Sequence, residues 1–345
     1  MTARSLALLL PALWLSPLAC SDRFTGPGMT LETFPEATDF GPPSAPAPAP
    51  LPARGACVGR ADVEGTHDWS LEHAGRTRRY RVHVPPGLGT TRPLPVVFAF
   101  HGYAADEREQ EALSGLTREA DARGFIAVYP QGLNGPELTG GGDADTRAWN
   151  AGLCCGPARD AHVDDVGFVD ALLADLDARL CVDSHRLFAT GYSNGAFFAY
   201  RLACERSEFF AAIAPVAGME GFGPCTPTRP VPVMHFHGTD DRTIRYPGGT
   251  HELLTGPYPS AAESVARWAG RNDCRGRAFA TYVRGDSTCD TYSPCEDNAA
   301  VTLCTSRGAG HTWPGGEVPA EQGPTSGDLD ASREMWRFFT THPRP

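Results

Sequence analysis

The stretch Arg186-Leu-Phe-Ala-Thr-Gly-Tyr-Ser-Asn-Gly-Ala196 predicts a buried strand that runs directly into a helix. At the junction, residues 191–195 form a G-x-S-x-G pattern, whose small residues permit a tight and strained backbone turn. Such a turn presents the hydroxyl of Ser193 above the edge of a sheet, where the positive end of the helix dipole favours negative charge. The pattern alone is weak, because ordinary turns also contain Gly and Ser. Its position between a strand and a helix makes Ser193 a candidate nucleophile.

Strands and helices alternate along the chain on both sides of this junction. Residues 80–84 alternate apolar and polar side chains, as in an outer antiparallel strand, whereas residues 95–100 form an apolar run that fits a strand covered on both faces. Asp164 is the expected N-cap of a helix over residues 165–180. The alternation predicts an α/β fold in one catalytic domain (57–345), with a mostly parallel central sheet and helices on both of its faces. The other predicted strands are 125–129, 186–190, 211–216, 231–236 and 301–305, and the other predicted helices are 107–123, 194–204, 262–272 and 329–341.

The composition describes a globular protein and excludes one class of partner. The 345 residues are 41% hydrophobic and 21% charged, so the chain can bury an apolar core. The formal net charge is -11, and Lys and Arg form no basic stripe. Because a polyanion would be repelled on average, we predict no nucleic-acid partner.

The first 20 residues have the features of a signal peptide. Arg4 is the only charged residue among them, and residues 5–15 are apolar but too few to span a bilayer. Cys20 is a candidate for lipidation, although Pro17 departs from the usual lipoprotein signal, and simple cleavage with secretion is the alternative. Residues 21–56 are rich in Pro and Ala and predict an extended tether. We therefore expect a secreted or outer-surface protein, anchored through Cys20 if it is lipidated, without a transmembrane span.

Eleven cysteines indicate a disulfide-bonded protein from an oxidising compartment. If Cys20 carries a lipid, ten cysteines remain and can pair completely. Their connectivity cannot be derived from the sequence, but the adjacent Cys154 and Cys155 favour two separate bridges over one strained ring. No pair of C-x-x-C motifs has zinc spacing, so no metal site is predicted. The candidates for disulfides are Cys57, Cys154, Cys155, Cys181, Cys204, Cys225, Cys274, Cys289, Cys295 and Cys304.

A serine nucleophile needs a histidine that accepts its proton and a carboxylate that orients the histidine. In chains with this serine turn, the order is serine, acid, histidine. The segment 233–241 is a strand followed by a polar turn, with Asp240 and Asp241 at its tip. His311 lies in a glycine-rich loop after the last predicted strand. Both positions follow strands, at the carboxyl edge where α/β sheets carry their sites. The pattern leaves Asp240 and Asp241 as alternative acids.

Two other histidines and two tryptophans have competing interpretations. His235 lies within a strand and fits a packed residue, while His237 precedes a glycine and is expected to brace the acid turn. Trp313 and Trp149 are candidates for the wall of a substrate groove, and a core role for either fits equally well.

Acyl transfer also requires backbone N–H groups that stabilise an oxyanion. One is expected from Asn194, the residue after the candidate nucleophile. The other is expected from Tyr103 or Gly102, in the loop after the early strand 95–100. This chemistry requires no cofactor.

Several segments together resemble one known family. The chain is similar, over residues 57–341, to secreted esterases that include polyhydroxybutyrate depolymerase-like lipoproteins and feruloyl and acetylxylan esterases, which have the α/β-hydrolase fold. The match is specific as an ordered set, whereas each segment alone is common. The segments are Phe100-His-Gly-Tyr103, Trp149-Asn150, Cys154-Cys-Gly156, Val163-Asp-Asp-Val-Gly-Phe168, Gly191-Tyr-Ser-Asn-Gly-Ala196, His237-Gly-Thr-Asp-Asp241 and Gly310-His-Thr-Trp-Pro-Gly315.

The resemblance implies that Asp241, the fifth residue counted from His237, is the catalytic acid. Three features depart from the family pattern. Tyr103 stands where many relatives have a cysteine, and Arg245-Tyr246 replaces a common Pro-Tyr. The insert 286–298 carries two cysteines and four acidic residues, which fits a disulfide-stapled loop better than a calcium site because the acidic residues lack an ordered ligand spacing.

The resemblance implies an extracellular, monomeric serine esterase with a Ser193–His311–Asp241 acyl-enzyme mechanism. The expected substrates are feruloyl- or acetyl-type esters of plant polysaccharide, with a polyhydroxyalkanoate oligomer as the alternative. A peptidase on the same fold and an inactive binding lipoprotein are more distant alternatives. The intact Ser193, Asp241 and His311 argue against the inactive protein.

Overall fold

The computed structural model describes residues 57, 63–88, 92–317 and 319–345, all within one compact unit that spans residues 36–345. The predicted signal peptide, Cys20 and the predicted tether lie outside the described residues. The lipidation and tether predictions therefore stay predictions.

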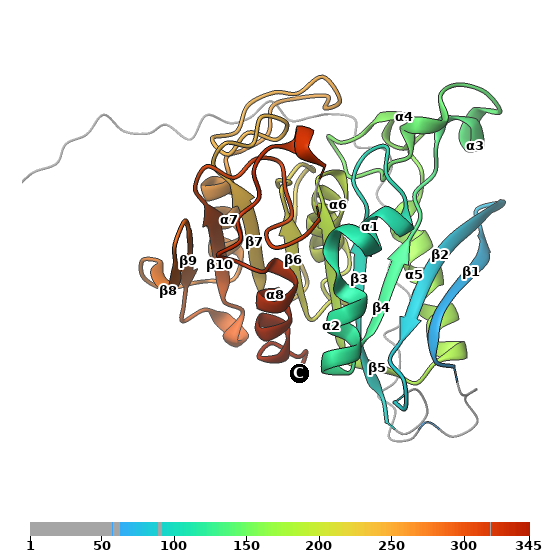
Figure 1. Ribbon diagram of the computed structural model, residues 1–345, viewed down its shortest axis with the longest axis horizontal. Helices are drawn as coiled ribbons and strands as arrows, with labels where there is room; N and C mark the ends of the chain where they lie inside the picture. The colour runs from blue at the N-terminus through green and yellow to red at the C-terminus, as the bar shows by residue number, and fades with distance from the viewer. Residues whose placement is uncertain (1–56, 58–62, 89–91, 318) are drawn as a thin grey trace, which may run out of the picture. The chain divides into compact units, whose positions relative to one another are not determined.

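The described residues form a ten-stranded sheet in the order β1-β2-β4-β3-β5-β6-β7-β10-β9-β8 (Figure 1). The six strands from β4 to β10 in this order are parallel to one another, and antiparallel strands extend the sheet at both edges. The predicted fold class is thereby confirmed. The strands are β1 (Gly65–His73), β2 (Arg76–Val84), β3 (Leu94–Phe100), β4 (Ile126–Pro130), β5 (Val182–Tyr192), β6 (Ala212–Val216), β7 (Val233–Gly238), β8 (Phe279–Arg284), β9 (Ser287–Tyr292) and β10 (Val301–Ser306).

Helices cover both faces of the sheet (Figure 1). The helices α1 (Glu107–Ser114), α2 (Leu116–Arg123) and α8 (Ala331–Thr340) pack on one face, and α5 (Asp165–Arg179), α6 (Asn194–Glu205) and α7 (Ala261–Arg271) pack on the other. Two separate clusters of buried apolar residues result, one on each face. The short helices α3 (Gly135–Thr139) and α4 (Gly156–Asp160) lie in the connection between β4 and α5.

Local chemistry explains where these elements begin and end. Asp164 is the N-cap of α5 as predicted, because its side chain accepts the N–H of Gly167 at 2.9 Å. The predicted helix 107–123 is instead two helices, because Gly115 between them has φ +61° and ends α1 in the left-handed region. The antiparallel strands β1, β8 and β9 escaped prediction. The side chains of β8 are mostly exposed, so that strand lacks a buried apolar run.

Five disulfides join the ten described cysteines: Cys57–Cys181, Cys154–Cys155, Cys204–Cys225, Cys274–Cys295 and Cys289–Cys304. The expectation that Cys154 and Cys155 form separate bridges is wrong. They are bonded to each other across a cis peptide, since the other eight cysteines pair among themselves. Five disulfides fit an oxidising compartment outside the cytoplasm.

The insert 286–298 is a stapled segment, as expected, with strand β9 at its start. Cys289 is bonded to Cys304, its directly opposite partner on β10, and Cys295 is bonded to Cys274 after α7. Within the described residues, no group of three or more carboxylate, His or Cys side chains is arranged to hold a metal ion.

In the part of the chain that the structure describes, every helix is too short or too polar to cross a membrane.

A buried ion pair joins the outer strand β2 to helix α5. The Nη2 of Arg78 lies 2.7 Å from Oδ1 of Asp165, and both side chains are almost completely buried. The other oxygen of Asp165 accepts the backbone N–H of Asn150 at 2.8 Å. The pair therefore also holds the connection that enters the candidate site.

We expect Arg78→Met to lower the free energy of unfolding by about 3–5 kcal/mol, because Asp165 would keep a buried charge without its partner. Arg79→Met is the matched control on the same strand. Arg79 is 64% exposed and 3.7 Å from Glu137, so its loss should cost less than about 1 kcal/mol. Urea unfolding of both variants checks this, and equal losses would contradict it.

Candidate active site

Ser193 occupies a strained turn between β5 and α6. Its backbone has φ +54° and ψ -117°, a conformation that costs a residue with a side chain about 1–3 kcal/mol. The Ser193 N–H donates to the carbonyl of Val216 at 2.9 Å. The neighbouring glycines are required by space: a Cβ on Gly195 would overlap the carbonyl oxygen of Phe100, and a Cβ on Gly191 would overlap the carbonyl oxygen of Gly195.

His311 and Asp241 are hydrogen-bonded to each other, with 2.7 Å between Nδ1 and Oδ2. Both residues are only 4% exposed. The backbone of His311 is fixed by its N–H, which donates to the carbonyl of Gln322 at 2.8 Å, and by the Tyr192 hydroxyl, which donates to its carbonyl at 2.5 Å. Because Nδ1 donates to the carboxylate, Nε2 of a neutral ring is free to accept a proton.

Asp241 is held as a carboxylate by several donors. Its Oδ1 accepts the N–H groups of Thr243 at 2.9 Å and Ile244 at 2.8 Å, and its Oδ2 lies 3.2 Å from Nε2 of His237. Burial alone would raise the pKa of Asp241, but hydrogen bonds from His237 and His311 hold the pKa well below the ordinary 3.8. Asp240 is exposed, and within the described residues its side chain accepts one hydrogen bond, from the hydroxyl of Thr239 at 3.0 Å.

A chain of buried hydrogen bonds extends from Asp241 into the protein core. The Nε2 of His237 faces two acceptors, Asp241 and the Ile244 carbonyl at 2.7 Å, so it carries the proton. Its Nδ1 then accepts from Nε2 of His235 at 3.1 Å, and Nδ1 of His235 accepts from the Tyr200 hydroxyl at 2.8 Å. Burial lowers the pKa of His235 well below its usual value. The packed role predicted for His235 and the bracing role predicted for His237 are confirmed.

The loop after β3 lies beside the serine turn. A Cβ on Gly102 would lie 3.5 Å from the Cβ of Ser193, so the two segments are in close contact. Burial lowers the pKa of His101 to about 4, so this ring is neutral; its Nδ1 donates to the carbonyl of Gly102 at 2.7 Å, and its Nε2 accepts from Gly132 at 2.9 Å. Asn194 is the first residue of α6, where a backbone N–H has no acceptor within the helix.

These segments surround a cavity of about 420 Å³. Ser193, His311, Gly102 and Tyr103 all line it. Its apolar lining includes the disulfide Cys154–Cys155, Ile244, Leu253 and Leu254, and its polar lining includes Glu109, Gln110, His251, Glu317 and Gln322. One cavity therefore brings together the candidate nucleophile, the candidate base and one candidate oxyanion residue.

Comparison with protein-family models gave no match. A probable feruloyl esterase C from Aspergillus clavatus is 36% identical over 254 residues, which are 68% of this chain and 82% of the relative. A putative esterase, NocK, from Nocardia uniformis is 32% identical over 311 residues, which are 80% of this chain and 85% of the relative.

The chain belongs to the feruloyl esterase family. It spans only 44% of the length of another relative, feruloyl esterase B from Piromyces equi, at 28% identity over 70% of this chain. Among solved structures, an acetyl xylan esterase from Aspergillus awamori superposes with a TM-score of 0.54 at 16% identity, covering 79% of this chain and 99% of that one. This feruloyl esterase family member is thus a carboxylic-ester hydrolase with the α/β-hydrolase fold.

The two tryptophans are not part of the cavity wall. The interpretation that they line a substrate groove is therefore wrong. Trp149 and Trp313 are completely buried, and neither lines the cavity of this esterase. The ring of Trp149 stacks on Phe198 with 5.2 Å between centroids, and Nε1 of Trp313 donates to the hydroxyl of Ser332 at 3.0 Å. Both therefore have core roles.

Sequence reasoning missed most of the residues that line the cavity of the esterase. Leu253, Leu254 and His251 come from a loop without regular secondary structure, and Gln110 comes from α1. Nothing in their local pattern distinguishes them from ordinary loop or helix residues. Only the assembled fold reveals their position.

Asp241→Asn should lower kcat of the esterase by about 10³- to 10⁴-fold, because an amide does not stabilise the imidazolium and favours the wrong tautomer of His311. The neighbouring Asp240→Asn should change kcat by less than about two-fold, since Asp240 is exposed. Steady-state hydrolysis of p-nitrophenyl acetate checks both. A larger loss of kcat in Asp240→Asn than in Asp241→Asn would contradict the assignment of Asp241 as the partner of His311.

The pKa of Asp241 also predicts a pH dependence of stability. A carboxyl group whose pKa is lower in the folded state stabilises the fold above its unfolded pKa, and this contribution is lost as the pH falls toward the folded pKa. Between about pH 5 and pH 2, the free energy of unfolding should therefore fall more for the wild type than for Asp241→Asn. Urea unfolding across this range measures the difference, and parallel curves would refute the prediction.

Proposed function

We propose that this chain is an extracellular serine esterase with Ser193 as nucleophile, His311 as general base and acid, and Asp241 as the residue that orients His311. The observation that carries the proposal is the buried 2.7 Å hydrogen bond between His311 and Asp241, beside a cavity that Ser193 also lines. The strained backbone of Ser193 at the start of α6 supports it independently.

In the first half of the reaction, Nε2 of His311 accepts the hydroxyl proton of Ser193 while the serine oxygen attacks the ester carbonyl carbon. The carbonyl oxygen gains negative charge, which the backbone N–H groups of Asn194 and Tyr103 stabilise. When the intermediate collapses, the imidazolium gives its proton to the leaving alcohol, and an acyl-enzyme remains. Asp241 stabilises the imidazolium because it is a carboxylate at neutral pH.

In the second half, water replaces the alcohol. His311 accepts a proton from the water, which attacks the acyl-enzyme, and the same N–H groups stabilise the second oxyanion. The proton then passes to Ser193, which is regenerated as the acid leaves. Apart from this water, no step in the sequence requires a group from outside the chain and its ester substrate.

For the substrate, we propose feruloyl- or acetyl-type esters of plant polysaccharide. The relatives named as feruloyl esterases support this class. The cavity offers an apolar lining for an acyl group and polar side chains, among them Gln110 and Gln322, for the hydroxyls of a sugar alcohol. A polyhydroxyalkanoate oligomer is the alternative that the assay below distinguishes.

For the location, we propose export through the signal peptide, with Cys20 as an optional lipid anchor. The five disulfides support an oxidising compartment. Intact-mass analysis of membrane and soluble fractions should find a diacylglyceryl group on Cys20, and its absence would end the anchoring proposal.

Ser193→Ala tests the mechanism. Wild type and variant are compared on p-nitrophenyl acetate, methyl ferulate and a 3-hydroxybutyrate oligomer. The variant should lose at least about 10³-fold in kcat/KM on every ester that the wild type hydrolyses, because no other group replaces the nucleophile. The wild type should hydrolyse methyl ferulate faster than the oligomer.

A folded Ser193→Ala variant with wild-type turnover would refute the mechanism. Faster cleavage of the oligomer than of methyl ferulate would replace the proposed substrate class with a polyester.

A further inference from the structure

The segment 149–156 contacts both chain segments that supply the proposed oxyanion N–H groups. It enters the site at Trp149, turns through the disulfide Cys154–Cys155 and leaves into α4 at Gly156. The turn is closed on itself, because the N–H of Ala151 donates to the carbonyl of Cys154 at 2.6 Å and the N–H of Cys155 donates to the carbonyl of Trp149 at 3.3 Å.

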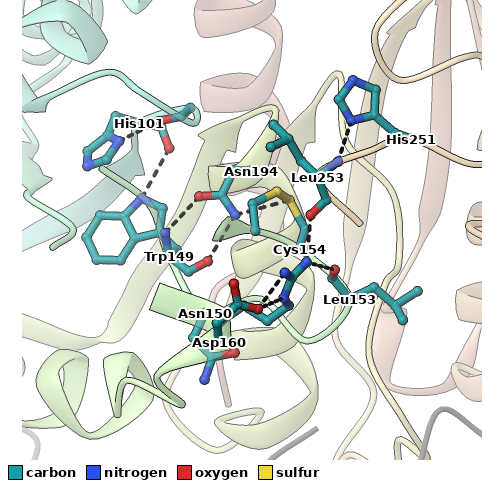
Figure 2. The surroundings of a disulfide bond; sticks show 12 residues. His101, Trp149, Asn150, Leu153, Cys154, Asp160, Asn194, His251 and Leu253 are labelled. Atoms are coloured by element: carbon teal, nitrogen blue, oxygen red, sulfur yellow. Dashed lines mark hydrogen bonds and ion pairs between the residues drawn. A yellow bond between two sulfur atoms is a disulfide. The ribbon is translucent and has the colours of Figure 1, made fainter. Parts of the chain in front are cut away.

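One end of the segment holds Asn194. The side-chain oxygen of Asn194 accepts the backbone N–H of Trp149 at 2.8 Å, and its Nδ2 donates to the carbonyl of Trp149 at 3.1 Å and to Sγ of Cys154 at 3.4 Å (Figure 2). Both ends of this amide are therefore engaged. A residue fixed through its side chain has little freedom to rotate its backbone N–H, which in Asn194 points toward the oxyanion in the proposed mechanism.

The same segment also contacts the loop after β3. The Nε1 of Trp149 donates to the carbonyl of His101 (Figure 2), with 3.1 Å between the two atoms. His101 directly precedes Gly102 and Tyr103. At the other end, a Cβ on Gly156 would lie 2.7 Å from the ring of Tyr103, so a larger residue here would force the Tyr103 side chain to shift. The two oxyanion positions come from different strands, and the segment contacts both.

We propose that residues 149–156, closed by the disulfide Cys154–Cys155, are a positioning element that sets the distance between the two oxyanion N–H groups. The inference rests on the proposed function. The covalent link between adjacent residues restricts the backbone at Cys154, which places Sγ against Asn194. Trp149 couples the two sides, since its backbone holds Asn194 and its ring nitrogen holds the His101 carbonyl.

The burial of Cys154 and Cys155 distinguishes the positioning role of this disulfide from that of a residue that only lines the cavity. Cys154 and Cys155 line the cavity, yet they are only 1% and 3% exposed, and the polar contact of Cys154 is directed at Asn194. A wall affects how tightly one substrate binds. An element that positions the oxyanion donors affects the transition state of every ester, so its loss should appear in kcat and not in KM.

The test compares three variants on p-nitrophenyl acetate and methyl ferulate. Cys154→Ala/Cys155→Ala removes the disulfide and the sulfur that accepts from Asn194. We expect kcat to fall about ten-fold or more on both esters, with KM within about two-fold of the wild-type value. Trp149→Phe keeps the aromatic packing but removes the Nε1 donor, and should lower kcat about three- to ten-fold in the same manner. If the double alanine variant does not fold, Trp149→Phe alone tests whether the segment positions the oxyanion donors.

Cys204→Ala/Cys225→Ala is the matched control, because this disulfide holds the opposite end of the same helix, α6. It should lower the Tm without changing kcat. Unchanged kcat in each of Cys154→Ala/Cys155→Ala and Trp149→Phe that folds, or a rise in KM alone, would overturn the positioning role. Those variants retain Ser193, so this failure is distinct from a failure of the serine mechanism, which Ser193→Ala reveals separately.

Discussion

The strained backbone of Ser193 is the constraint on which the rest of the site depends. A residue held at φ +54° and ψ -117° persists only where its surroundings leave it no alternative. Here two contacts hold the backbone of Ser193 in this conformation: its hydrogen bond to the carbonyl of Val216 and the close approach of β3 to the neighbouring Gly195. The approach of two backbones at Gly195 also brings the loop after β3 next to the serine. One packing constraint thus brings the proposed nucleophile and one side of the proposed oxyanion site together.

The sheet order supplies the remaining groups. β5, β6, β7 and β10 are neighbours and parallel, so the turns that follow them meet at one edge. Asp241 follows β7 and His311 follows β10, which brings residues 70 positions apart in sequence into hydrogen-bonding distance. The carboxylate is buried, and this is tolerated because His311, His237 and two backbone N–H groups all donate to it. The hydroxyl of Tyr200 and the rings of His235 and His237 extend that support into the core.

Features of the fold and of the site were predictable from the sequence where the interactions that determine them are local in the chain. The serine turn, the N-cap at Asp164 and the acid turn are encoded within a few neighbouring residues, and each was found from the sequence. The pairing of Cys154 with Cys155 and the core position of Trp149 depend on segments far apart in the chain. The local pattern of Trp149 fits two outcomes equally well, and the adjacency of Cys154 and Cys155 favoured the outcome that the structure does not have. Gly115 is an intermediate case, since a glycine inside a helical pattern is compatible with both a continuous helix and a break.

Covalent labelling of the folded protein with a fluorophosphonate tests the central claim most directly, because such a reagent phosphonylates only an activated serine. After digestion, mass spectrometry should locate the adduct on Ser193, and labelling should be lost when the protein is unfolded in urea or when His311 is replaced by Ala. An adduct on another residue, or a folded protein that gains no adduct, would contradict the account.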